Sequence, residues 1–294
     1  MTTDTPATAD KIRNAARQLI DRNPAYAAIL SFYTEVFVAQ ENARTGLQLV
    51  VKPIDAAQRR AKSAGRLPLI EPRDFPIDAA GARALLDTVL ALTQDGGGEL
   101  AASATRLASS LTRDEGLATR LFNALITEDE AALAATADQI GVPAAHLAFL
   151  SYHAVRPSLI TGAELLATDW AEAVDWNQGY CPICGSPPVL SLLQADGRRA
   201  LVCRFCWHQW NVPRQFCPLC NNPTPRGQNY FTAQGDKAWR VDFCESCKGY
   251  IKTVDTREIA RYCYAPLEQV ATLHLDIKAQ ELGFAGGWPP PASP

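Results

Sequence analysis

The sequence predicts an α+β protein with an N-terminal all-helical domain, two tandem rubredoxin-like/zinc-ribbon four-cysteine modules, and a closing C-terminal helix. Eight of its nine cysteines form four Cys-x-x-Cys pairs within 67 residues, whereas residues 1–175 contain none. Glycine, proline and β-forming residues replace alanine after Trp176. We expect a helical domain at 1–176, modules at 177–215 and 216–264, and a helix with a flexible Pro-rich tail at 265–294.

The first strong helix signal begins at Asn23-Pro24, where a capping residue precedes a proline suited to the first helical position. Residues that are apolar except for the last then recur at the i, i+3, i+4, i+7 spacing of one helix face. This stripe consists of Tyr26, Ile29, Leu30, Tyr33, Val36, Phe37 and Gln40. The pattern predicts a helix that buries one side.

Prolines 53, 68, 72 and 76 exclude a single helix across this stretch and predict an extended surface connection. Later alanine-rich segments favour close helix packing. We predict helices at about 79–93, 99–111, 114–126, 128–140, 143–154 and 159–175. His146 and His153 lie seven residues apart without a metal-binding His-Glu-x-x-His pattern, and we interpret them as core or interface histidines.

Two β-hairpins are predicted where β-forming segments flank the cysteine pairs. The first joins 189–193 with 200–202, and the second joins 229–232 with 239–243. The chain is then expected to return to one helix at about 266–282.

The cysteines are predicted metal ligands, because two Cys-x-x-Cys turns supply the four sulfurs of one tetrahedral site. Gaps of 18 and 23 residues suit hairpins that bring successive turns together. We therefore predict two ions, iron or zinc, each in a four-cysteine site. The ligand sets are Cys181, Cys184, Cys203 and Cys206 in one site, and Cys217, Cys220, Cys244 and Cys247 in the other. Cross-braced pairing remains open, since its longer loops cost little additional closure entropy.

Other reactive residues in this half receive simpler interpretations. His208 could substitute as a ligand, but four cysteines already fill a site. Cys263 is interpreted as a buried, inert thiol. Aromatic residues interleaved with arginines could stack nucleic acid, but we expect them to form the core of the small modules. The excess of five positive charges over 178–252 nearly balances the −4 of two divalent four-thiolate sites, so we do not expect nucleic acid as a partner.

Several functional classes lack their signatures. The N-terminus shows no apolar signal segment, and no run of 18 apolar residues predicts a membrane span. A cytoplasmic location follows, where metal thiolates are favoured over disulfides. Gly-x-Ser-x-Gly, Walker and Gly-x-Gly-x-x-Gly motifs are missing, so we predict no enzymatic activity. The sequence leaves a homo-oligomer open.

The cysteine segments, taken as a set, resemble the formate dehydrogenase accessory protein (FdhE) family. The similarity covers roughly 178–283, with a looser match from Asn23 to Gln40. The matching strings are Tyr180–Val189 (YCPICGSPPV), Cys203–Trp210 (CRFCWHQW), Cys217–Cys220 (CPLC), Cys244–Lys252 (CESCKGYIK) and Ala271–Asp276 (ATLHLD).

The resemblance implies a cytoplasmic accessory protein that is required for active respiratory formate dehydrogenase, binds iron in rubredoxin-like sites and contacts the enzyme's catalytic subunit. This chain has Glu268-Gln269 where the family often has an Asp pair. A role of the Asp pair in partner binding therefore does not carry over directly to this chain. A rubredoxin-type electron carrier and a nucleic-acid-binding zinc ribbon remain alternatives.

Overall fold

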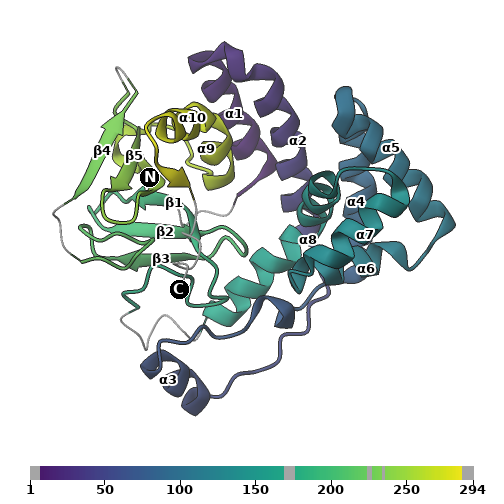
Figure 1. The fold of residues 1–294 in the computed structure, drawn as a ribbon, viewed down its shortest axis with the longest axis horizontal. Coiled ribbons are helices and arrows are strands. Elements are labelled where there is room, and N and C mark those ends of the chain that lie inside the picture. The colour runs from purple at the N-terminus through teal and green to yellow at the C-terminus, as the bar shows by residue number, and fades with distance from the viewer. Residues whose placement is uncertain (1–6, 169–175, 224–226, 234–235, 287–294) are drawn as a thin grey trace. The chain divides into compact units, whose positions relative to one another are not determined.

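The computed structural model describes residues 7–168, 176–223, 227–233 and 236–286 (Figure 1). The chain forms two compact units. One comprises Met1–Leu30, Ile54–Ile70 and Leu166–Pro294, and the other Ser31–Pro53 and Glu71–Leu165. The first contains the sheet and several helices, and the second is helical, which confirms the predicted α+β class. The domain boundaries expected from sequence stay a prediction, and the Pro-rich end of the tail lies outside the described residues.

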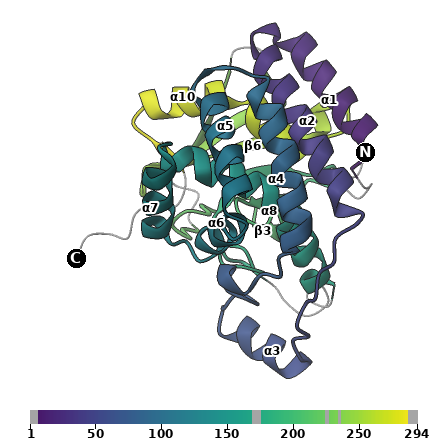
Figure 2. The same ribbon diagram turned by 90° about the vertical axis from the view of Figure 1, so that its right-hand side faces the viewer.

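The N-terminal half is helical, as predicted. Its elements are α1 (Ala9–Arg22), the 3₁₀ turn η1 (Pro24–Tyr26), α2 (Ala27–Arg44), α3 (Ala56–Ala64), the 3₁₀ turn η2 (Pro72–Asp74), α4 (Ala79–Gln94), α5 (Gly98–Arg113), α6 (Leu117–Ile126), α7 (Glu130–Ile140) and α8 (Ala144–Ala167). Figure 2 faces the helices α4 to α8 of the second unit. Leu30, Val36, Phe37 and Gln40 of the predicted stripe are buried.

One predicted helix break does not occur. We expected separate helices at 143–154 and 159–175, but α8 runs from Ala144 to Ala167 with Pro157 inside it. A proline removes the N–H that would bond the carbonyl four residues earlier, here that of His153. The Gln40 side chain of α2 replaces this donor, because its Nε2 lies 2.8 Å from the His153 oxygen. The last predicted helical residues, 169–175, lie outside the described part of the chain.

The connection between the prolines is less extended than predicted. The short helix α3 forms within it, because Asp55 caps the helix by accepting a hydrogen bond from the Gln58 N–H at 2.8 Å. The following stretch has no regular secondary structure, and two of its N–H groups, from Leu69 and Ile70, donate to the first cysteine turn.

The cysteine half forms one continuous sheet. Its strands are β1 (Pro188–Leu193), β2 (Arg199–Cys203), β3 (Gln209–Val212), β4 (Gln228–Thr232), β5 (Trp239–Cys244), β6 (Gly249–Asp255) and β7 (Ala285–Gly286). The order is β3-β2-β1-β6-β5-β4, with β7 paired to β6. Both predicted hairpins are confirmed as β1–β2 and β4–β5. Strands β3, β6 and β7 were not predicted.

The two modules are joined by a parallel strand pair. Leu190 of β1 lies opposite Lys252 of β6, and Leu193 lies opposite Asp255. Arg199 reinforces this junction from β2, because its guanidinium donates to the Phe216 carbonyl at 2.8 Å and reaches Asp242 of β5 at 3.4 Å. The tandem modules therefore share one hydrogen-bonded sheet.

The closing helix is divided in two, which corrects the single helix expected over 266–282. Helix α9 (Ala265–Ala271) ends at Thr272, whose hydroxyl donates back to the Glu268 carbonyl at 2.7 Å, and α10 (Leu273–Glu281) follows. The break leaves the His274 N–H available to donate to the Tyr26 hydroxyl at 2.9 Å. Helix α10 is fixed to the sheet by Lys252 and Asp276, whose charged groups lie 2.6 Å apart.

Candidate metal centres

The first predicted quartet is assembled by the β1–β2 hairpin. Pro188 pairs with Cys203, which brings the turn before β1 beside the turn after β2. All four sulfurs of Cys181, Cys184, Cys203 and Cys206 lie within 4.8 Å of one another. Each of these residues is at most 3% exposed. The main-chain N–H groups of Phe205 and Cys206 point at the Cys203 sulfur, at 3.3 and 3.4 Å.

The second quartet repeats this arrangement in the other hairpin of the sheet. Gln228 pairs with Cys244 in the β4–β5 hairpin, and the turn containing Cys217 and Cys220 lies beside that containing Cys244 and Cys247. The sequence-predicted sets are the sets that the fold brings together, and neither quartet is cross-braced. Ligation of metal by these eight residues stays a prediction.

All four cysteine turns share one backbone feature. The residue after each second cysteine has a positive φ, a left-handed conformation that is favourable for glycine and strained for larger residues. These residues are Gly185 (76°), Trp207 (61°), Asn221 (55°) and Lys248 (55°). Only one turn uses glycine, so the other three maintain the same geometry at a conformational cost.

The sulfur positions fit a tetrahedral metal. Four sulfurs each about 2.3 Å from a central ion lie about 3.8 Å apart. Three sulfur pairs of the first quartet are separated by 3.5 to 3.7 Å, and two pairs of the second by 3.8 and 4.0 Å. Zinc and iron both suit four thiolates at these distances.

Burial disfavours ionisation of two thiols in each quartet. Burial raises the pKa of Cys181 and Cys206 well above the usual range, whereas hydrogen bonds from neighbouring thiols lower the pKa of Cys184. In the second quartet, burial raises the pKa of Cys247 to about 11 and that of Cys217 further. Metal binding must therefore displace protons, and the affinity falls as pH falls.

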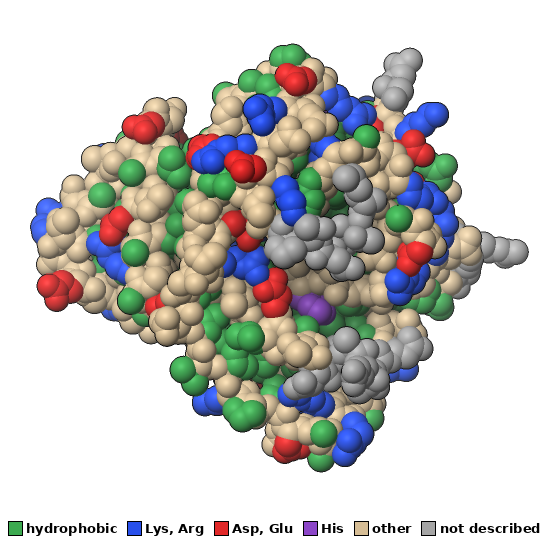
Figure 3. All heavy atoms as spheres, turned by 180° about the vertical axis from the view of Figure 1, so that it is seen from behind, with side chains coloured by type: hydrophobic (Ala, Val, Ile, Leu, Met, Phe, Trp, Pro, Cys, Tyr) green, Lys and Arg blue, Asp and Glu red, His purple; other side chains and the backbone are tan. Residues whose placement is uncertain are grey.

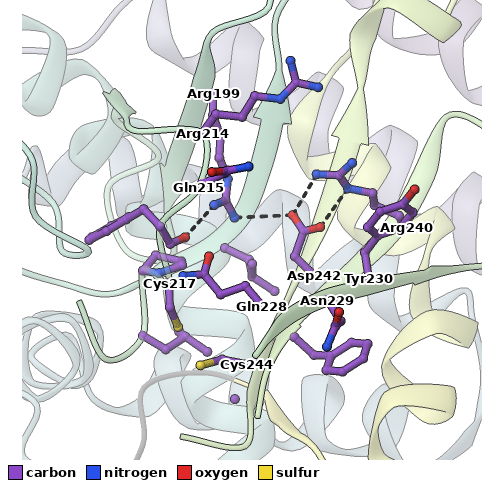
Figure 4. Close-up of a pocket in the computed structure, with 16 residues that line it drawn as sticks. Arg199, Arg214, Gln215, Cys217, Gln228, Asn229, Tyr230, Arg240, Asp242 and Cys244 are labelled. Carbon is purple, nitrogen blue, oxygen red and sulfur yellow. Dashed lines mark hydrogen bonds and ion pairs between the residues drawn. The ribbon is translucent and has the colours of Figure 1, made fainter. Parts of the chain in front are cut away.

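A cavity of about 250 Å³ borders the second quartet (Figure 4). Cys217 and Cys244 line one side, and the sheet supplies Arg199, Arg240 and Asp242. Sequence reasoning missed this feature, because its residues come from five separate segments. The sequence feature that came nearest to indicating this cavity was the net positive charge of residues 178–252.

The other residues singled out in the sequence lie outside the quartets. His208 contributes its main-chain oxygen to the Cys203 N–H at 2.9 Å. Burial raises the pKa of Cys263, which keeps this half-buried thiol protonated. His153 is buried and His146 accepts or donates a 2.8 Å hydrogen bond with Ser103. Of the module aromatics, Trp210, Phe216, Trp239 and Tyr250 are buried, as expected of a core, whereas Tyr230 is exposed.

Glu268, at the position of the family's Asp pair, is fully buried. Its carboxylate accepts from Arg261 Nη2 and from Trp239 Nε1, both at 3.0 Å. The Gln269 main-chain oxygen accepts from Lys252 Nζ at 2.9 Å. These groups tie α9 to the sheet, so the Glu268 side chain is not available on a surface.

The fold and the quartets define a protein with two four-cysteine centres of rubredoxin or zinc-ribbon type in a single sheet. Residues 180–214 match the family model described as "FdhE, central domain". An FdhE homolog from Aquifex aeolicus is 31% identical over 142 residues, covering 47% of this chain and 49% of the relative. One from Erwinia tasmaniensis is 28% identical over 279 residues, covering 93% of this chain and 85% of the relative.

The crystal structure of the FdhE protein from Pseudomonas aeruginosa has the same fold. Its TM-score is 0.68 at 21% sequence identity, with 96% of this chain and 95% of that chain covered. The predicted resemblance to the FdhE family is thus confirmed. The matched segment is about half the length of the Aquifex relative, although the alignment with the Erwinia relative is nearly full length.

Proposed function

We propose that this chain is a non-enzymatic accessory protein for the maturation of respiratory formate dehydrogenase, and that it acts in the cytoplasm by contacting the catalytic subunit of that enzyme. The observation that carries the proposal is the pair of four-cysteine groups in one sheet of an FdhE-like fold. Among the described residues, no helix is sufficiently long and apolar to cross a membrane.

The eight cysteines are proposed to hold two metal ions. The sulfur spacing supports four-thiolate coordination, and the exclusive use of sulfur favours zinc or iron over harder cations. When bound, either ion would cross-link the two cysteine turns of its own hairpin and so stabilise that hairpin. Iron would in addition provide a one-electron couple.

A test of the partner uses the full chain as bait for the cytoplasmic precursor of the catalytic subunit. We expect a complex, and a deletion strain should lose formate dehydrogenase activity. Recovery of activity by the wild-type chain, but not by Cys184→Ser or Cys220→Ser, would link the role to the centres. Normal activity in the deletion strain, together with no complex, would refute the proposal.

Metal analysis tests the ligand assignment separately. The wild-type protein, prepared without oxygen, should contain two ions per chain. Cys184→Ser and Cys220→Ser should each retain one, and the double variant none. One ion in all three variants would instead indicate that the two substitutions affect the same site.

A rubredoxin-type electron carrier is the second candidate, favoured by the exposure of Cys220 at the protein surface. It requires red, iron-loaded protein with a reversible one-electron couple. Colourless protein carrying two zinc ions after anaerobic preparation would exclude it. Nucleic acid binding finds less support, because Trp210, Phe216, Trp239 and Tyr250 are buried, although Tyr230 is exposed, and because the face in Figure 3 intersperses both signs of charge.

A further inference from the structure

The two quartets differ in their access to solvent. Every cysteine of the first is buried, whereas Cys220 of the second is exposed and Cys247 is half-buried. Metal release from a thiolate site begins when an outside ligand reaches the ion or when a thiolate leaves it. Exposed sulfurs permit both, so burial is a direct determinant of exchange rate.

The first quartet is also covered by a separate segment of the chain. Leu69 N–H donates to the Pro182 carbonyl and Ile70 N–H to the Ile183 carbonyl, both at 2.9 Å. The Tyr180 hydroxyl donates to the Arg66 carbonyl at 2.7 Å. These hydrogen bonds attach residues 66–70 to the turn between Cys181 and Cys184. An attacking ligand would have to displace this segment first.

The second quartet instead borders the cavity of about 250 Å³. Cys217 and Cys244 form part of its wall, and their sulfurs lie at one end of the residues drawn in Figure 4. Such a volume accommodates a small chelating molecule or one arm of a larger one. The cavity thus provides a route to two sulfurs that are otherwise buried.

The charge of the cavity determines which molecules would enter. Its lining contains three arginines and one acidic residue, Asp242. Asp242 is shared, at 3.4 Å from Arg199 Nη2 and 2.8 Å from Arg240 Nε. Arg240 also lies over the Tyr230 ring, 4.8 Å from its centroid. After Asp242 has neutralised one arginine, the lining keeps two positive charges, and one of them belongs to exposed Arg214. These two charges offset the −2 of a divalent four-thiolate centre. An anion can therefore approach without net repulsion.

We propose that the second four-cysteine group exchanges its metal with small anionic chelating ligands that enter this cavity, whereas the first group retains its metal. The inference rests on the proposed metal-binding role and assigns different tasks to the two centres. In each step one metal–sulfur bond breaks, one bond from the metal to the incoming ligand forms, and the released thiolate takes a proton from water.

The test follows metal release from cobalt-loaded protein by the loss of its thiolate-to-metal absorption. With EDTA as the anionic chelator, we expect two phases of equal amplitude, one at least tenfold faster than the other. Cys184→Ser should show only the fast phase and Cys220→Ser only the slow one. Iodoacetamide labelling read by mass spectrometry should modify Cys217, Cys220, Cys244 and Cys247 before the other four, which assigns the phases without substitutions.

The role of the cavity charge is tested with Arg214→Gln. This variant should slow the fast phase with EDTA on the order of threefold to tenfold, and the effect should shrink at high salt. Release by neutral 1,10-phenanthroline should not change. Arg198→Gln, which removes the same charge from the exposed β1–β2 turn, is the matched control and should leave both rates unchanged.

Two ions that leave at one rate, or faster release from the first group, would overturn the inference and leave the metal-binding role intact. Equal slowing of EDTA and phenanthroline by Arg214→Gln would overturn the anionic entry route. A wild-type chain that loads no metal would overturn the proposed function itself.

Discussion

Gln40 is expected to stabilise α8 by replacing the hydrogen bond that Pro157 removes. In Gln40→Leu, the His153 carbonyl loses the donor at 2.8 Å, and Arg156 loses the acceptor on Gln40. An unsatisfied buried polar group costs about 1–3 kcal/mol, and more where a charge is involved. We therefore expect the free energy of unfolding of the helical unit to fall by about 2–4 kcal/mol.

A double-mutant cycle isolates the carbonyl contribution. Pro157→Ala restores an N–H that can donate to the His153 oxygen within the helix. In that background the carbonyl stays satisfied when Gln40 is replaced, whereas the loss at Arg156 is unchanged. The two substitutions should therefore couple by about 1–2 kcal/mol.

Urea unfolding followed by far-UV circular dichroism measures this coupling, because helices dominate that signal. Hydrogen exchange of α8 peptides provides a local check on the same protein. If Gln40→Leu costs the same in both backgrounds, within about 0.5 kcal/mol, the replacement of the missing donor by Gln40 is refuted.

Three further results are expected. Gly185→Ala should weaken the first centre by about 1–2 kcal/mol, because the φ of Gly185 is 76° and Pro68 lies 3.2 Å from the added Cβ. Lys248→Gly should leave the second centre as stable as before or more so, because it relieves a positive φ. The two variants are compared by following metal retention during urea titrations. Arg199→Leu should destabilise the sheet by about 3–5 kcal/mol, because it removes a hydrogen-bond donor from both Asp242 and the Phe216 carbonyl. Thermal unfolding measures the effect, and an unchanged unfolding temperature would contradict this expectation. Burial lowers the pKa of His153 to about 3, so between pH 6.5 and 3 this histidine is protonated in the unfolded chain and neutral in the folded one. The free energy of unfolding should therefore fall by about 1.4 kcal/mol per pH unit as the pH drops from 6.5 towards 3. His153→Leu should flatten this slope, as measured by urea unfolding at several pH values.

Local patterns predicted the elements well because their causes lie within a few residues. The Cys-x-x-Cys spacing and the hairpin lengths predicted which sulfurs meet, and the apolar stripe ending at Gln40 predicted the buried face of α2. Pro157 misled the helix prediction, because the compensating side chain is more than a hundred residues away in the chain.

Features that depend on distant segments were not predictable in this way. The parallel pairing of Leu190 with Lys252 has no local signature, and neither has the bridge from Arg199 to Asp242. The hydrogen bonds from Leu69 and Ile70 to the first cysteine turn likewise join segments that are far apart in the sequence. Four chemically equivalent cysteine turns therefore acquired different surroundings from the fold.

The parallel β1–β6 pair also sets an order of events during protein synthesis. Strand β1 ends at Leu193 and β6 begins at Gly249, so 55 residues must be translated between them. At about 5–20 residues per second, β1 is available for roughly 3–11 s before synthesis of the strand that covers its inner edge begins. During this interval the β1 edge is an open template for wrong pairing. Early metal capture by the first cysteine group would hold its hairpin in register until β6 arrives.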